Sequence, residues 1–193
     1  MNPKIERFVS PGKGNGIRAT QKILAGELIC SAQPLASCVS NKSARKICHN
    51  CFSRCESLLR CSQCRSARYC HTACQRQAWP EHKRECRSLR SLLPRMPSDS
   101  VRLAARIIFR LLDPSPGSSE ELYSLEEHET HLGVMSEEKR EGLTQLGSML
   151  QLYLQQEVPA LSQEVTSPLP SGLDPLSLLA RVSSVLQFAA VVQ

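Results

Sequence analysis

Eight residues with the chemistry of zinc ligands, spaced in four pairs, constrain this chain more than any other feature. They are Cys48, Cys51, Cys61, Cys64, Cys70, Cys74, His82 and Cys86. The pairs read C-x2-C, C-x2-C, C-x3-C and H-x3-C, and a pair of this spacing reaches one metal ion without strain. Four pairs supply two complete tetrahedral sets, which leave no open coordination position for water. The sequence therefore predicts two Zn2+ ions that hold structure rather than perform chemistry.

Spacing alone does not decide which pairs share a metal ion. In a sequential arrangement the first four ligands would bind one ion and the last four the other. In an interleaved arrangement the first and third pairs would share one ion, and the second and fourth pairs the other. In each of the last two pairs the two ligands stand four positions apart, so each pair is expected to face one way on a helical turn.

Disulfide bonds are the alternative explanation for so many cysteines, and they require an oxidising compartment. The opening residues 1–8 lack the apolar core of a signal peptide, which argues against that explanation. The three cysteines outside the metal pattern, Cys30, Cys38 and Cys55, are therefore expected to be reduced thiols in the cytoplasm or nucleus. Apolar runs stay well short of the roughly 18 residues that a membrane helix needs, so no membrane contact is expected.

Positive charge is concentrated around the metal ligands. Residues 41–90 contain twelve Lys or Arg and three Glu, whereas the whole chain has a formal net charge of +6. Thiolates and zinc ions together lower the charge of this region, yet it stays basic. A basic surface attracts phosphate backbones or acidic peptides, and it can equally be a solvated face without a ligand.

Alternating glycines precede the metal region, at Gly12, Gly14 and Gly16. Glycine permits a positive φ and a close approach of a ligand to the backbone, although a plain loop would also use it. The alternation at Ile17–Ala19, a turn at Ala25–Gly26 and an apolar run at Leu28–Cys30 predict a β-hairpin between residues 17–19 and 28–30.

The metal region resembles a MYND zinc finger, on the residues Tyr69–Gln75, Trp79–Lys83 and Cys86. The resemblance implies the interleaved arrangement, with Cys48, Cys51, Cys70 and Cys74 on one ion and Cys61, Cys64, His82 and Cys86 on the other. It also argues against a RING ubiquitin-ligase finger, whose histidine stands near the middle of its ligand series, because here the histidine is seventh.

A second resemblance lies upstream, where Gly14–Ala19, Ile23 and Gly26–Ile29 look like the opening of a SET domain. A SET opening followed by a MYND finger is similar to the SET- and MYND-domain (SMYD) protein-lysine methyltransferases. The runs Leu59–Arg65 and Pro80–Cys86 look like the branch of that family that methylates histone H3 and a kinase. The resemblance implies an α+β fold, with part of a split SET domain in residues 1–47, the MYND finger in 48–86 and a helical SET insert in 87–193.

The same resemblance implies S-adenosyl-L-methionine as the cofactor of a protein-lysine N-methyltransferase that acts on histone and other proteins. The positions that match the family's cofactor residues are Lys13, Gly14, Asn15, Tyr123 and His131. Taken without the resemblance, His131 would be an ordinary surface histidine.

Helices are predicted after the finger. Ser98 and Asp99 can cap a helix whose apolar stripe runs from Val101 to Leu112. The acidic stretch 118–133 is expected to be helical and solvated, and a further helix is expected to begin at Ser136 and end before Pro159. Residues 167–172 read as a linker, and 176–192 as an apolar helix.

The family's later Asn-His-Ser-Cys motif, its channel tyrosine and its post-SET zinc site do not occur in this sequence. We therefore expect a truncated chain that is inactive by itself, with no catalytic residue assigned, because methyl transfer depends on positioning within a complete channel. The alternative is a zinc module that binds proline-containing peptides or DNA without catalysis. The expected partners are protein substrates or such peptides, with DNA as a further candidate, for a monomer of the cytoplasm and nucleus.

Overall fold

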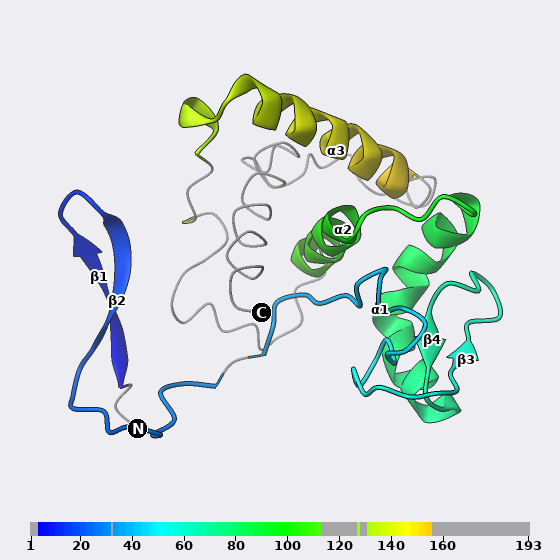
Figure 1. The fold of residues 1–193 in the computed structure, drawn as a ribbon, viewed down its shortest axis with the longest axis horizontal. Coiled ribbons are helices and arrows are strands. Elements are labelled where there is room, and N and C mark those ends of the chain that lie inside the picture. Colours follow the sequence, from blue (N-terminus) through cyan, green and yellow to red (C-terminus); the bar gives the residue numbers. More distant parts are fainter. Residues whose placement is uncertain (1–3, 32, 113–126, 128–130, 156–193) are drawn as a thin grey trace.

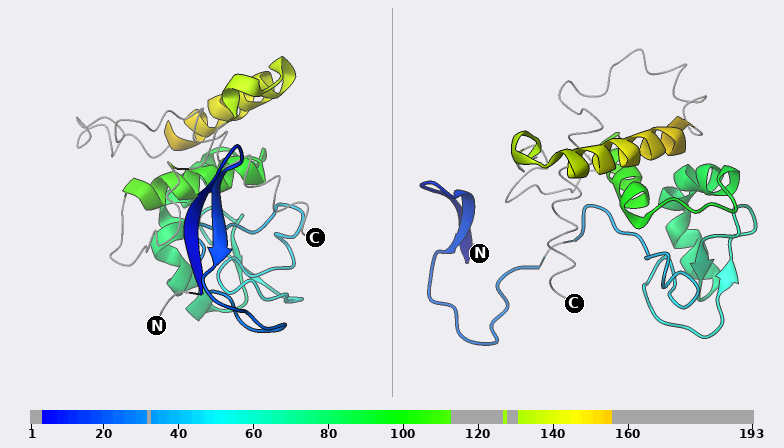
Figure 2. Two further views of the ribbon diagram at one scale, coloured as in Figure 1. Left: turned by 90° about the vertical axis from the view of Figure 1, so that its left-hand side faces the viewer. Right: turned by 45° about the horizontal axis from the view of Figure 1, so that its top comes forward.

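The computed structural model describes residues 4–31, 33–112, 127 and 131–155 of the 193-residue chain. Within them, helices are combined with two small antiparallel sheets, which is the mixed composition that was expected (Figure 1). One sheet forms an N-terminal hairpin and the other belongs to the metal region. Figure 1 and Figure 2 both show the hairpin standing apart from the helices.

The N-terminal hairpin pairs β1 (Ile5–Ser10) with β2 (Gly14–Ala19), in a register that runs from Ile5 opposite Ala19 to Ser10 opposite Gly14. Its turn is closed by the backbone N–H of Lys13, which donates to the carbonyl oxygen of Ser10 at 3.0 Å. Gly12 and Gly14 flank this bond with φ values of 73° and 78°, a region that favours glycine.

The prediction of a hairpin between residues 17–19 and 28–30 is wrong. The turn before Glu27 does form, with Gly26 at a φ of 82° and the Glu27 N–H bonded to the Leu24 carbonyl oxygen at 3.1 Å. Residues 28–30 nevertheless lie outside any strand and are exposed. The tighter glycine turn at residues 11–13 places β1 directly beside β2, and this local partner takes the place of the later one.

The metal region is built on β3 (Leu59–Arg60), β4 (Arg68–Tyr69) and the long helix α1 (Thr72–Ser91). The imidazole of His71 caps α1, because its Nδ1 accepts a hydrogen bond from the Cys74 N–H at 3.2 Å. Cys70 therefore precedes the helix, and the expectation that Cys70 and Cys74 share a helical turn is wrong. His82 and Cys86, by contrast, do lie one turn apart within α1.

Two further helices follow, α2 (Asp99–Leu112) and α3 (Glu137–Gln155), with the short 3-10 helix η1 (Leu132–Val134) before α3. The expected start of α2 is confirmed, since Ser98 Oγ accepts from the Val101 N–H at 3.3 Å. Figure 2 shows α3 crossing α2. One continuous hydrophobic core joins the metal region to both helices; its buried members from α2 and α3 are Val101, Ala104, Ala105, Ile107, Ile108, Phe109, Leu143, Leu150 and Tyr153.

The segment that enters the metal region, residues 37–41, is fastened to the N-terminal half of α2. Asp99 accepts hydrogen bonds from Ser40 Oγ at 2.7 Å and from the Asn41 N–H at 2.8 Å. The buried guanidinium of Arg102 donates to the carbonyl oxygen of Val39 at 3.0 Å. These bonds position the first ligand pair against the helices that come after the finger.

Several predictions fall outside the described residues. They concern Tyr123, nearly all of the acidic stretch 118–133, the linker at 167–172 and the apolar stretch 176–192. Among the helices that the structure does describe, none is long and apolar enough to cross a membrane.

Candidate metal centre

The first ligand cluster joins the first and third pairs of the sequence pattern: Cys48, Cys51, Cys70 and Cys74. Its sulfur atoms all lie within 4.8 Å of one another, with 3.7 Å between Cys51 and Cys70 and 3.5 Å between Cys70 and Cys74. The tight turn after Cys48, the loop before α1 and the first turn of α1 supply them. Cys48 and Cys74 are buried, whereas Cys51 is exposed.

The second cluster joins the second and fourth pairs: Cys61, Cys64, His82 and Cys86. The Cys61 and Cys86 sulfurs lie 3.8 Å apart, and the Cys64 sulfur lies 3.5 Å from His82 Nε2. All four side chains are at most 2% exposed. The loop between β3 and β4 brings two of them to α1, which supplies the other two.

Both clusters have the dimensions of a tetrahedral zinc site. Zinc–sulfur bonds of about 2.3 Å in a tetrahedron place the sulfur atoms about 3.8 Å apart, and a histidine nitrogen slightly closer. The separations of 3.5 to 3.8 Å match this geometry, whereas a disulfide would need about 2.05 Å. The structure therefore groups the eight residues in the interleaved order, in two sites that fit zinc.

The pKa values of the clustered thiols also favour a bound cation. Hydrogen bonds from Ser53 lower the pKa of Cys51 to about 6, while burial and the Cys74 thiol raise the pKa of Cys70. In the second cluster, burial and the charge of Cys64 raise the pKa of Cys86. Thiolates so close together repel one another, so all of them ionise only when a cation occupies the centre.

His82 is oriented for a metal by a buried carboxylate. Its Nδ1 lies 3.2 Å from Glu85 Oε1, which leaves Nε2 facing Cys64. Burial opposes a charged imidazole, but the Cys64 thiol and the Glu85 carboxylate outweigh burial and raise the pKa of His82 to about 10. A metal-binding histidine typically shares its second nitrogen with a carboxylate in this way, so Nε2 is the atom that would hold Zn2+.

Glu85 in turn connects the second cluster to the rest of the molecule. Its oxygens accept from Arg106 of α2 at 2.5 and 3.2 Å, and Tyr153 of α3 donates to Oε2 at 3.5 Å. Burial would raise the pKa of Glu85, but the bonds from His82 and Arg106 outweigh it and lower the pKa. Arg106 also donates to the carbonyl oxygen of Ser37 at 2.7 Å. One ionised carboxylate thus joins both later helices to a zinc ligand.

The sequence analysis missed both Glu85 and Arg106. A carboxylate three residues after a ligand histidine could have indicated the first, because metal-bound histidines are held by such groups. Arg106 directly follows the buried Ala105 in α2. A charged residue beside the apolar stripe of this helix was therefore the sequence signal that could have indicated Arg106.

The residues matched to a cofactor site lie in two places. Lys13 ends the turn of the β1–β2 hairpin and Gly14 and Asn15 begin β2, whereas His131 precedes η1 with a left-handed φ of 54°. Arg7 of β1 forms an ion pair with Glu127, which stands four positions before His131 in the sequence. Tyr123 lies outside the described residues.

Comparisons with known proteins agree with the metal centre. Residues 48–86 match the MYND finger family. The chain is 43% identical over 183 residues to the histone-lysine N-methyltransferase SMYD3 of Homo sapiens, covering 94% of this chain and 42% of that protein. It is 43% identical over 141 residues to the N-lysine methyltransferase SMYD2-B of Danio rerio, covering 72% and 32%.

A third relative is the histone-lysine N-methyltransferase Smyd1 of Mus musculus, which is 36% identical over 140 residues and covers 72% of this chain and 28% of that protein. The chain thus spans at most about two fifths of the length of these relatives. The similarity extends well beyond the finger in both directions, because it covers nearly the whole chain. Together with the interleaved ligand clusters, this shows that the chain belongs to the SMYD family.

Proposed function

We propose that this chain contributes the zinc-stabilised part of a protein-lysine N-methyltransferase that uses S-adenosyl-L-methionine. The observation that carries the proposal is the similarity over 94% of the chain to a histone-lysine methyltransferase. The bonds beside the second cluster support it, because Arg106 of α2 donates both to Glu85 of the finger and to the Ser37 carbonyl oxygen of segment 37–41. Residues 1–47 are proposed to be the N-terminal part of a split SET domain that the finger, residues 48–86, interrupts, and residues 87–193 to be its helical insert.

For the cofactor we propose the hairpin turn as one wall of the pocket, through Lys13, Gly14 and Asn15, and Tyr123 and His131 as another. S-adenosyl-L-methionine supplies the methyl group that is transferred to a lysine amine. Its amino-acid end carries a carboxylate, which suits a lysine side chain beside a glycine turn that lets the ligand approach the backbone. The positive φ of Gly14 supports this role for the turn.

Calorimetric titration of the zinc-loaded chain with S-adenosyl-L-methionine tests the cofactor proposal. One-to-one binding that is weakened by Lys13→Ala, and not by Lys22→Ala, would support a pocket at the hairpin turn. Lys22 is the matched control because it is an exposed lysine that follows β2 instead of preceding it. No heat of binding from a chain that still holds two zinc ions would contradict the assigned residues. A methylation assay on histone proteins would then test the reaction separately.

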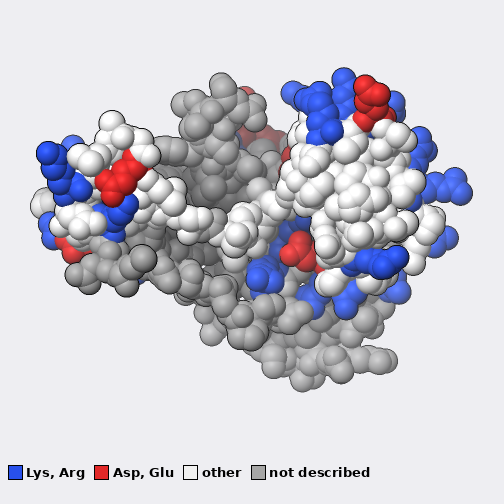
Figure 3. All heavy atoms as spheres, turned by 90° about the horizontal axis from the view of Figure 1, so that it is seen from below, with Lys and Arg blue, Asp and Glu red and all other residues white. Residues whose placement is uncertain are grey.

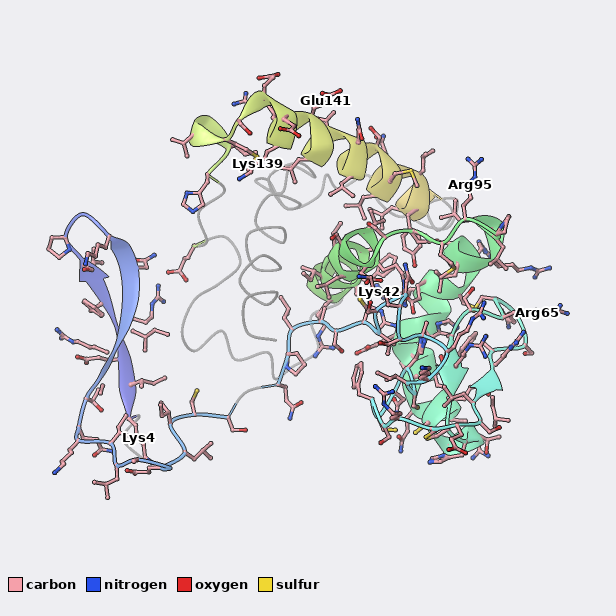
Figure 4. The ribbon with its side chains drawn as sticks, in the orientation of Figure 1. Lys4, Lys42, Arg65, Arg95, Lys139 and Glu141 are labelled. Atoms are coloured by element: carbon pink, nitrogen blue, oxygen red, sulfur yellow. The ribbon has the colours of Figure 1, made fainter. Side chains whose placement is uncertain are left out.

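An interaction module that binds proline-containing peptides or DNA is the second candidate, and the surface of the finger favours it. Phe52, Leu59 and Trp79 are exposed apolar side chains on the finger. Figure 3 shows Lys and Arg gathered around the edge of the same body, and Figure 4 shows Arg65 projecting away from it. Binding to DNA should weaken steeply with salt, whereas binding of a proline-rich peptide in an apolar groove should hardly change. We propose either role for a monomer of the cytoplasm and nucleus.

A further inference from the structure

Gly16 of β2 is a glycine for a different reason from the two glycines before it. Gly12 and Gly14 have positive φ values of 73° and 78°, whereas Gly16 lies outside that region. A methyl group at position 16 would come within 2.8 Å of Cε1 and 3.1 Å of Cζ of the Phe8 ring. Carbon atoms that are not bonded pack best about 3.5–4.0 Å apart. The ring of Phe8 therefore occupies the space that a side chain at position 16 would need.

The strand register explains why the Phe8 ring lies there. Phe8 is the direct partner of Gly16 in the β1–β2 sheet, and both residues are half-buried. A glycine opposite an aromatic residue lets the ring fold down over the neighbouring strand and cover its backbone. Such cross-strand contacts matter here, because a two-stranded sheet is only marginally stable by itself. The hairpin is a sheet of this kind, and it stands apart from the described helices (Figure 2).

Two charged residues on the same face help to hold the ring. The guanidinium carbon of Arg18 lies over the Phe8 ring, 5.4 Å from its centre. A guanidinium at that distance is attracted to the face of an aromatic ring. Glu6, the direct partner of Arg18, accepts a hydrogen bond from Arg18 Nε at 2.7 Å. The ring thus contacts Gly16 and lies beside a guanidinium that Glu6 orients.

This cluster lies directly beside the residues assigned to the cofactor, which end the turn and begin β2. One residue separates Gly16 from Gly14, and the pair of Ser10 and Gly14 ends the ladder two positions beyond Phe8. The Lys13 N–H then donates to the carbonyl oxygen of Ser10 at 3.0 Å and closes the turn. A turn that already has its final shape loses little entropy when a ligand binds.

We propose that Phe8 is a positioning residue for S-adenosyl-L-methionine. Its ring, packed over Gly16 and held by Arg18, keeps the turn in the shape that the ligand meets. Without the ring, a smaller fraction of the molecules has that shape, and the apparent affinity falls by the same factor. Gly16 is then required as space for the ring, and not for contact with the ligand. This inference rests on the proposed function, because it concerns the cofactor site assigned there.

Calorimetric titration of the zinc-loaded chain with S-adenosyl-L-methionine tests the role of the ring. Phe8→Ala and Gly16→Ala should each weaken binding by about three- to tenfold. Val9→Ala is the control for the first variant, because Val9 lies on the opposite face of the same strand and is 75% exposed. Gly142→Ala is the control for the second, because a methyl group at position 142 meets open space. Neither control should change the affinity.

A double variant separates a clash with the ring from a clash with the ligand. Once Phe8→Ala has removed the ring, adding Gly16→Ala should weaken binding by less than about twofold more, because the space is then open. An equally large effect of Gly16→Ala in both backgrounds would overturn the proposal, since the ligand itself would then need the glycine. So would a loss of affinity in Val9→Ala as large as that in Phe8→Ala.

Hydrogen exchange of the Lys13 amide, measured without cofactor, distinguishes failure of this inference from failure of the proposed function. Phe8→Ala should accelerate exchange of that amide by about three- to tenfold, the same factor as for binding, and Val9→Ala should not. An unsubstituted chain that binds no S-adenosyl-L-methionine would contradict the cofactor assignment, whereas accelerated exchange would still support the role of the ring in holding the turn. Unchanged exchange in Phe8→Ala would overturn that role whatever the calorimetry shows.

Discussion

The carboxylate of Glu85 lies 2.5 Å from Nη2 of Arg106, and the two residues are 21 positions apart in the sequence. Glu85 stands between two ligands of the second zinc cluster, whereas Arg106 belongs to the helix that packs against the finger. Since Glu85 is 1% exposed and Arg106 12% exposed, the pair is shielded from water. The metal centre and the helical core are therefore coupled through one buried ion pair.

Replacing Glu85 by glutamine should lower the free energy of unfolding by about 3 kcal/mol, because it leaves the buried Arg106 charge without its counter-charge. It should also weaken zinc binding in the second cluster by about tenfold, since His82 loses its ionised partner. Urea denaturation and competition with a chelator measure the two effects. The control is Glu81→Gln, which removes an exposed carboxylate 3.8 Å from the same arginine. Equal losses in the two variants would show that the buried pair does not couple the metal to the core.

The two clusters should lose zinc at different rates. Cys51 of the first cluster is exposed and Cys70 is half-buried, whereas all four ligands of the second cluster are buried. A chelator reaches an exposed thiolate directly, so the release followed with a colorimetric chelator should have two phases. Cys51→Ser should remove the fast phase and Cys86→Ser the slow one. A single phase in the unsubstituted chain would contradict this prediction.

Only the buried face of helix α3 should contribute substantially to the free energy of unfolding. Leu150 is fully buried against the core, and truncation to alanine should cost about 3 kcal/mol of unfolding free energy because a cavity remains. Leu152, two positions along the same helix, is 50% exposed, so Leu152→Ala should change stability by less than about 1 kcal/mol. Urea denaturation of the zinc-loaded variants gives both values. Similar losses would mean that the outer face of α3 is also covered.

The attachment of residues 37–41 to α2 can be read from hydrogen exchange. Asp99→Ala removes the carboxylate that accepts from the Asn41 N–H at 2.8 Å, so exchange of that amide should accelerate. Ser98→Ala removes only the cap of α2, at a cost of about 1 kcal/mol, and should leave the Asn41 amide protected. If both variants expose this amide equally, fraying of the helix explains the exchange and the Asp99 bond does not.

Most of the metal centre could be predicted from the spacing of its ligands. All eight residues could be named from the sequence, because the need of zinc for four close ligands imposes regular short gaps. Which ligand pairs share a metal ion could not be predicted from spacing. A loop such as 61–64 can fold back to α1 or stay beside its sequence neighbour without any change in spacing. The interleaved order came from resemblance to the MYND finger, and the structure has that order.

The failures of sequence reasoning have physical causes as well. The partner of β2 was misassigned because the apolar residues 28–30 look like a strand. In β1 the alternation of apolar and polar residues is weak, and its pairing with β2 is decided by the turn at Gly12. Glu85 looked like one more surface charge in a polar helix. Its burial depends on Arg106 and Tyr153, which come from elements far along the chain, and no local pattern records a contact of that kind.

Helix α1 supplies three of the eight ligands, and it continues past the last of them to Ser91, burying Ser88 and Leu89 beyond Cys86. The stretch recognisable by its ligand pattern is thus smaller than the piece that can fold. A fragment cut at Cys86 would keep every ligand, but it would lose buried Leu89 together with Arg106 and Tyr153, which contact Glu85. The finger of this protein is consequently not a self-contained folding unit. Transplanted into another protein by its ligand pattern alone, it would expose charged and apolar surface that the later helices cover here.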